Sequence, residues 1–128
     1  MPRYLLSVFA PAEPVSFGNY GSKEAMLEAF AATGAFNDKL EREGRLVFAD
    51  GLAPVPTAMT VDARGGAPVW TDGPHLRAAE HLGGFWVIEA ANHDEARTLA
   101  EEASAACRGA VEVRPFTTAE SFEALRNS

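Results

Sequence analysis

The spacing of apolar residues changes along this chain, and each change predicts a new element. Runs rich in β-forming residues predict strands at residues 4–10, 45–54, 82–91 and 110–116. Apolar spacings of three and four predict two helices, one starting after Ser22 and one after Asn92. A Gly65-Gly66 turn predicts a hairpin between residues 58–64 and 68–71, and the tail SFEALRNS predicts a short helix or a frayed end.

Each helix has one apolar stripe and recognisable end signals. The expected buried stripes are Met26, Phe30, Thr33, Phe36 and Leu40 in the first helix, and Ala96, Leu99, Ala100, Ala103 and Cys107 in the second. Asn37 is expected on the polar side of the first helix. Gly44 is placed to end that helix, and Asn92 with Glu95 forms a capping-box pattern at the start of the second.

The order of elements is β-α-β-(hairpin)-β-α-β, which predicts an α+β fold. It is a ferredoxin-like split βαβ with an inserted hairpin, in a single domain over residues 1–128. On the strand at 82–91, Phe85 and Val87 point to one face while Trp86 and Ile88 point to the other. Two helices can cover one face only, so a second copy is expected on the other, giving a homodimeric α/β barrel with some interior space.

Charge and composition exclude several classes of partner. The net charge is −7 with no cluster of Lys and Arg, so neither nucleic acid nor an anionic membrane surface is an expected partner. Cys107 is the one cysteine, which fits a reducing compartment and is expected to be a small buried thiol. The apolar run near the N-terminus is short and ends at Pro11, so a first strand explains it better than a signal peptide. We therefore expect a cytoplasmic protein.

Six stretches along the chain together resemble the YCII-related family, in the branch named after its DGPF motif. They are YLLSVF, DGL at 50–52, TDGP at 71–74, EHLGGF at 80–85, IEAANHDEA and GAVEVRPF. The resemblance implies a dimeric α/β barrel, and relatives of the family include a dehalogenating lyase acting on a chlorinated muconolactone. Genes of the DGPF branch often lie beside those of alternative sigma factors.

This chain departs from the family pattern at three points. His75 stands where Phe usually follows Asp-Gly-Pro, and Arg77 and Ala79 stand where an acidic residue and Lys are common. Members outside this branch have been proposed to use an Asp–His pair with its His on the first helix. No histidine lies between Ser22 and Gly44 here. Such a pair would have to be rebuilt from His75 or His81, or it is absent.

Asp72 is the first candidate for chemistry, and it has two readings. The structural one is that Asp-Gly-Pro forms a turn unaided, with the carboxylate accepting backbone N–H groups and Gly73 supplying a positive φ. The functional one is a general base at the mouth of the barrel. Asp50 also ends a strand before a glycine, so the two carboxylates are expected to face one cavity.

His75 and His81 flank the segment LRAAE, for which one helical turn is expected. Either histidine is a candidate acid or orienting group, and the alternative is an ordinary surface or hydrogen-bonded residue. Together with Asp72 they match no tight metal motif, so no metal and no cofactor is expected. Candidate ligand-binding residues are Asp50, Arg77, Trp70 and Phe85. Gly83 and Gly84 allow close approach of a ligand or a neighbouring strand, the second being more common.

Two functions remain open at this level. The first is a cofactor-free lyase or isomerase that binds a small organic acid or lactone and moves a proton, with Asp72 as base and His75 or His81 as acid. The second is a non-catalytic module that senses a ligand or meets a regulatory protein, with a link to an alternative sigma factor. The histidines after Trp70 favour the enzyme, and the missing first-helix histidine favours the module.

Overall fold

The computed structural model describes residues 1–128, apart from the side chain of Asn19. Its strands are β1 (Arg3–Pro11), β2 (Leu46–Gly51), β3 (Met59–Asp62), β4 (Val69–Asp72), β5 (Glu80–Glu89) and β6 (Val111–Pro115). Its helices are α1 (Lys23–Arg42), α2 (His93–Cys107) and α3 (Ala119–Arg126), with short 3₁₀ turns η1 (Gly18–Tyr20) and η2 (Val55–Thr57). No helix of these described residues is both long and apolar enough to span a bilayer.

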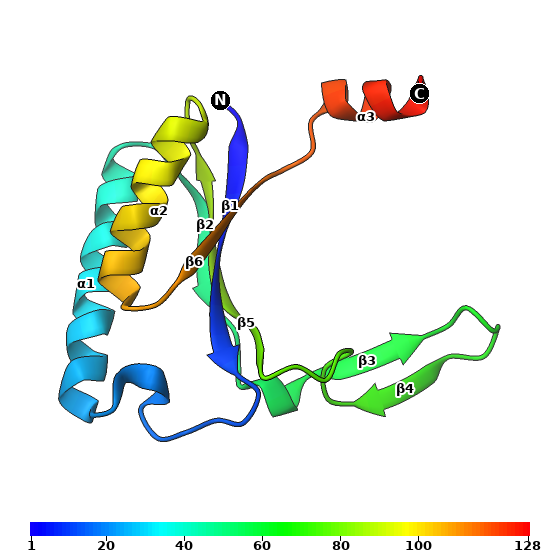
Figure 1. Ribbon diagram of the computed structural model, residues 1–128, viewed down its shortest axis with the longest axis horizontal. Helices are drawn as coiled ribbons and strands as arrows, with labels where there is room; N and C mark the ends of the chain where they lie inside the picture. Colours follow the sequence, from blue (N-terminus) through cyan, green and yellow to red (C-terminus); the bar gives the residue numbers. More distant parts are fainter.

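Four strands form one antiparallel sheet in the order β2-β5-β1-β6, while β3 and β4 pair only with each other. This is the ferredoxin-like α+β arrangement with an inserted hairpin that the sequence predicts. Figure 1 shows α1 and α2 side by side on one face of the sheet, while the β3–β4 hairpin and α3 project from the opposite side. The sheet therefore has a covered face and an open face.

The covered face holds the core, as the helical stripes predict. Tyr4 and Leu6 of β1 lie opposite Ile88 and Trp86 of β5, and all four side chains are buried. The buried side of α2 packs against them, and because most of its residues are small, the helix lies close to the sheet. The buried residues of α2 are Ala96, Leu99, Ala100, Ala103, Ala106 and Cys107. The second helical stripe and the buried Cys107 thiol are thus confirmed.

The first helical stripe needs two corrections. Phe36 and Leu40 are buried as expected, but Phe30 is exposed and meets the ring of Tyr20 edge-on, with centroids 6.1 Å apart. Asn37, expected on the polar side, instead faces the sheet, where its Oδ1 accepts a 2.6 Å hydrogen bond from the Trp86 Nε1–H. A buried indole N–H needs an acceptor, and this side chain supplies it.

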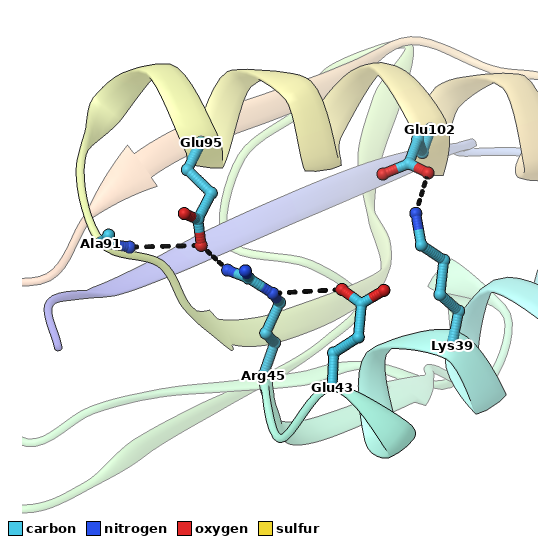
Figure 2. A network of polar contacts seen from close by, with 6 residues as sticks. All are labelled: Lys39, Glu43, Arg45, Ala91, Glu95 and Glu102. Atoms are coloured by element: carbon cyan, nitrogen blue, oxygen red, sulfur yellow. Dashed lines mark hydrogen bonds and ion pairs between the residues drawn. The ribbon is translucent and has the colours of Figure 1, made fainter.

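Side chains at the helix ends fix the helices to each other and to the sheet. The Asn92 side chain accepts the Glu95 N–H at 2.9 Å, so the predicted N-cap is confirmed. The return bond differs from a capping box: the Glu95 carboxylate accepts the Ala91 N–H at 3.3 Å and pairs with Arg45 (Figure 2).

Arg45 also pairs with Glu43 at 3.1 Å, so this arginine belongs to the packing of the two helices and not to a substrate site. A second link, Lys39 of α1 with Glu102 of α2, lies further along the same helix pair (Figure 2).

Two glycines bring β5 very close to its neighbours. A Cβ on Gly83 would lie 2.7 Å from the Cβ of Ala10, and one on Gly84 would lie 3.3 Å from the Asp50 carbonyl oxygen. The register between β1 and β5 shifts at this point, since Val8 faces Gly84 while Phe9 faces Leu82. Close strand approach is therefore the reason for this glycine pair, as the more common reading of the sequence holds.

Candidate functional site

The Asp-Gly-Pro turn lies at the end of β4, where the hairpin returns towards the sheet. Gly73 has φ +101°, the conformation that the turn requires of a glycine. The Gly73 N–H donates to the Ala58 oxygen at 2.7 Å, and the Thr60 hydroxyl donates to the Gly73 oxygen at 2.9 Å. The turn is thus held by groups of β3 and the residue before it, and the Asp72 carboxylate has no hydrogen-bond or ion-pair partner within the described part of the chain.

Beside this turn lies an open cavity of about 650 Å³, which we call the DGP cavity. It brings together four of the residues that the sequence singles out: Asp72, His75, Arg77 and His81. Its remaining lining is mostly apolar and comes from Ala12, η2, Thr71 of β4 and the segment between β4 and β5. A carboxylate, two imidazoles and a guanidinium around one cavity of ligand size form a combination able to bind and deprotonate a small acid.

The four groups differ in how far they are withdrawn from water. Asp72, His75 and Arg77 are exposed, whereas His81 is half-buried and its Nε2 is buried with no hydrogen-bond partner in the described structure. A buried imidazole nitrogen without a partner is costly, so a ligand or another chain that bonds to it would be favoured. Residues 76–79 are irregular, and β5 already begins at Glu80, so His81 is the second residue of that strand. The helical turn expected for LRAAE is therefore wrong.

His75 lies close enough to the hairpin to influence its charges. Hydrogen bonds from the Arg64 side chain, and then from its backbone N–H, hold the pKa of the Asp62 carboxyl below its ordinary value, and His75 adds a smaller electrostatic contribution. The Asp62 carboxylate receives both the Nε–H and the Nη2–H of Arg64, at 3.0 and 2.7 Å. Asp62 is thus already paired.

Asp50 and Phe85 lie elsewhere, on the lining of a second cavity of about 460 Å³ around Trp86, the Trp86 cavity. The Asp50 carboxylate accepts the N–H of Gly51 at 2.8 Å. In the single chain, Asp50 and Asp72 therefore line different cavities, contrary to the expectation that both would face one. Trp70 belongs to neither lining; it is 64% exposed on the hairpin.

The Trp86 cavity includes residues that sequence reasoning did not select, namely Tyr20, Asn37 and Arg108. Burial raises the pKa of the Tyr20 phenol, Cys107 raises it further, and Arg108 opposes the shift. These groups come from η1, α1 and the end of α2, which are far apart in sequence. A sequence signal existed only for Asn37, which lies four residues after Thr33 and three before Leu40 and so shares their side of the helix.

No group of three or more His, Cys, Asp or Glu side chains in the described residues is arranged to hold a metal ion.

The chain is similar to a family model, to a curated relative and to a solved structure. The model of the YCII-related domain matches residues 6–120. An uncharacterised protein of Rhizobium meliloti (strain 1021) is 33% identical over 97 residues, which cover 74% of this chain and 78% of that protein. The structure of the 5-chloro-2-hydroxyhydroquinone dehydrochlorinase TftG from Burkholderia phenoliruptrix AC1100, in complex with 2,5-dihydroxybenzoquinone, covers 92% of this chain and 96% of its own at 16% identity, with a TM-score of 0.46.

Proposed function

The chain belongs to the YCII-related family, and from this premise we propose that it is a cofactor-free lyase or isomerase acting by proton transfer on a small organic acid or lactone. The observation that carries the proposal is the DGP cavity, where Asp72, His75, Arg77 and His81 share one lining. These residue types supply a base, two candidate acids and an anion-binding group.

The chemistry assigns one role to each group. The Asp72 carboxylate removes a proton from the carbon beside the substrate carbonyl, and the C–H electron pair becomes part of a new C=C bond. In an elimination, a leaving group departs with its bonding electrons; in an isomerisation, His75 or His81 returns a proton to a more distant carbon. Arg77 pairs with a substrate carboxylate. His81 has the buried Nε2 that a bound oxygen or N–H group would satisfy.

The test uses an unsaturated five-membered lactone as the probe, α-angelica lactone, with deuterium incorporation and double-bond migration followed by NMR in D₂O. The wild-type chain is expected to accelerate exchange, and Asp72→Asn is expected to lose about 100-fold or more of that rate, the usual weight of a general base. His75→Gln and His81→Gln identify the acid. Asp62→Asn is the matched control, because Asp62 lies on the same hairpin but is already paired with Arg64.

Two results would count against the enzyme. One is that the wild-type chain reacts no faster than buffer with any of three probes. These are the angelica lactone, a chlorinated lactone assayed by chloride release, and an unsaturated acid. The other is an Asp72→Asn variant that keeps the wild-type rate, which would remove Asp72 from the mechanism.

The second candidate is a non-catalytic ligand-sensing module, and the Trp86 cavity favours it. That cavity is mainly apolar, of ligand size, and has a few polar groups such as Tyr20 and Asp50 on its lining. Binding without turnover would support it: an apolar aromatic acid should then quench the fluorescence of a Trp70→Phe variant, in which Trp86 is the remaining tryptophan.

A further inference from the structure

The Trp86 cavity and the DGP cavity meet at the paired ends of β1 and β5. At the end of β1, Ala10 lines the Trp86 cavity and Ala12 lines the DGP cavity. On β5, Gly83 lines the Trp86 cavity and His81 lines the DGP cavity. We call these four residues the shared wall. Figure 1 shows this end of β1 and β5 between the loop that leads to α1 and the hairpin.

The shared wall is packed too tightly to absorb a displacement. A Cβ on Gly83 would lie 2.7 Å from the Cβ of Ala10 and 3.2 Å from its backbone nitrogen. Ala10 pairs with His81 in the ladder, and the Ala12 N–H donates to the Ala79 oxygen at 2.8 Å. Because close-packed groups hardly compress, pressure from the Trp86 cavity on the Ala10–Gly83 contact moves the ladder and shifts His81.

The His81 imidazole has an unmet hydrogen bond at the DGP end of the wall. Its Nε2 is buried, and no group in the described part of the chain bonds to it. A buried nitrogen without a partner is costly, so a small movement towards the DGP cavity, where a bound oxygen or N–H group can reach Nε2, is favoured. His81 therefore has two useful positions, one withdrawn into the wall and one turned into the cavity.

The side chains of the Trp86 cavity favour a flat aromatic ligand. Its volume of about 460 Å³ is that of a small-molecule site. Tyr20 and Phe30 meet edge-on at the α1 side, and Trp86 lines the sheet side. Glycine backbone, which a flat ring can approach closely, contributes from four separate segments. These glycines are Gly18, Gly51, Gly84 and Gly109.

One end of the cavity carries a cation and a phenol. Arg108 follows α2 at φ +62°, and its N–H donates to the Ser104 oxygen at 2.9 Å, which fixes this residue beside the cavity. Its guanidinium lies 3.7 Å from the exposed Glu28 carboxylate, which makes a weak ion pair. Burial raises the pKa of the Tyr20 phenol, so its hydroxyl stays protonated and can donate a hydrogen bond. The two groups together suit a carboxylate.

The acidic residue of the same lining lies at the other edge of the sheet. Asp50 is on β2, which β5 and β1 separate from β6, the strand that follows Arg108. The Asp50 carboxylate already accepts the Gly51 N–H at 2.8 Å. The charges of the cavity thus orient an aromatic acid with its carboxylate towards Arg108.

We propose that the Trp86 cavity is a regulatory site for a flat aromatic carboxylate, and that a ligand there pushes the shared wall so that His81 turns into the DGP cavity. The ring lies between Tyr20 and Trp86, and the carboxylate pairs with Arg108. The consequence for catalysis rests on the proposed function: Nε2 of His81 then reaches the substrate, and proton transfer accelerates. Coupling between two binding sites is reciprocal, so a ligand in the DGP cavity also tightens the binding of the aromatic acid.

The first test compares the arginine of each cavity by calorimetric titration with 2-naphthoate. The wild-type chain is expected to bind it, and Arg108→Gln to bind it about 10-fold more weakly or worse, because a charge-assisted hydrogen bond is lost. Arg77→Gln should bind like wild type. The alcohol 2-naphthalenemethanol, which has the same rings without the charge, should bind equally to wild type and Arg108→Gln. Both arginines are exposed, so both variants should fold.

Two results of this titration would overturn the site. One is no binding of 2-naphthoate at millimolar concentration. The other is weaker binding by Arg77→Gln than by Arg108→Gln, which would place the acid in the DGP cavity.

The second test follows the three imidazoles by ¹H–¹³C NMR during the same titration. The His81 signals are expected to shift with the dissociation constant found by calorimetry. Those of His93 should stay in place, because His93 packs against Tyr4 and lines neither cavity. A His81 signal that does not move while 2-naphthoate binds would refute the coupling.

A matched pair of variants tests the shared wall itself. Ala10 and Ala49 are half-buried strand residues that both line the Trp86 cavity, but Ala10 alone belongs to the wall. Ala10→Gly removes the Cβ that meets Gly83, so it should bind 2-naphthoate almost as wild type does and lose most of the His81 shift. Ala49→Gly should keep both. Equal His81 shifts in the two variants would contradict transmission through the wall.

The binding and NMR readouts need no turnover, so the two proposals can fail separately. A His81 shift without any lactone exchange would leave the coupled site correct and the enzyme wrong. Lactone exchange that stays the same at saturating 2-naphthoate would leave the enzyme correct and its regulation wrong. If both proposals hold, 2-naphthoate should raise the exchange rate severalfold in wild type and much less in Ala10→Gly.

Discussion

The two faces of the four-stranded sheet are built from the same strands but differ in how far their side chains are buried. On the face under α1 and α2, Leu6 and Ile88 are fully buried, while on the other face Phe9 and Phe48 remain 37% and 54% exposed. Both faces are apolar, so hydrophobicity alone does not decide which residues form the core. What differs is the cover: two tethered helices lie on one side, and two projecting arms border the other.

The largest expected effect comes from the covered face. Ile88→Ala removes a fully buried side chain and should lower the free energy of unfolding by about 2–5 kcal/mol. Its neighbour Val87 points to the open face and is half-buried, so Val87→Ala should cost about 1 kcal/mol or less in dilute protein. Urea denaturation at several protein concentrations measures both. If Val87→Ala costs as much as Ile88→Ala in dilute protein, the contrast between the faces is wrong.

The next effect concerns the glycine that lets β5 approach β1. Gly83→Ala would bring a Cβ to 2.7 Å from that of Ala10, so we expect a loss of about 1–3 kcal/mol from the forced shift of the strands. Gly34→Ala is the control, because nothing lies within 4 Å of its added Cβ and alanine favours the helix by roughly 0.5–1 kcal/mol. Thermal unfolding should rank the proteins Gly34→Ala, wild type, Gly83→Ala, and a Gly83→Ala variant as stable as wild type would contradict the close approach.

An effect of similar size tests the polar contact inside the covered face. Asn37→Leu removes the acceptor of the Trp86 indole N–H and should cost about 1–3 kcal/mol, because the buried donor is left unpaired. Asp38→Leu is the control on the exposed side of the same helix. Denaturant melts followed by Trp86 fluorescence in a Trp70→Phe background measure the difference. Equal stabilities of the two variants would mean that the bond contributes nothing.

The smallest effect concerns the link between the helices. The hydrogen bond from Lys39 to Glu102, helped by the negative charges of Glu102 and Glu43, raises the pKa of the Lys39 ammonium above its ordinary value, against a smaller desolvation effect. A raised folded pKa gives stability that is fully present below the unfolded pKa and is lost as pH rises through the folded one.

Denaturation from neutral to strongly alkaline pH should therefore show a steeper alkaline loss in wild type than in Lys39→Met. Parallel curves would mean that the pair does not favour the charged ammonium in the folded state.

The covered face could be predicted from the sequence because its signals are local. Ala96, Leu99 and Ala103 follow the helical period, and Asn92 is a standard cap, so α2 was predicted with its buried side. Phe30 follows the same period but remains exposed, because it borders the Trp86 cavity and contacts Tyr20 instead of packing into the core. Periodicity states which side of a helix is apolar; it does not state how far the opposing surface extends.

The candidate site was predictable in part for the same reason. Asp72, His75, Arg77 and His81 lie within ten residues, and one segment brought them to one cavity. Asp50 comes from another strand, and its distance from Asp72 depends on how far the inserted hairpin leans from the sheet. That angle is set by tertiary packing, and no residue pattern states it.

The Gly51–Gly84 pair lets the length of the inserted segment change without altering the sheet. β2 ends where Gly51 pairs with Gly84, and the Leu52 N–H donates to the Gly83 oxygen at 2.8 Å. The chain rejoins the sheet at Glu80, four residues before Gly84 on β5, so its exit and its return form one short neck. The cost of closing a loop grows slowly with its length. Insertions or deletions beyond this neck can therefore accumulate during evolution without disturbing the sheet, and relatives can differ in the reach of their hairpin while keeping the same body.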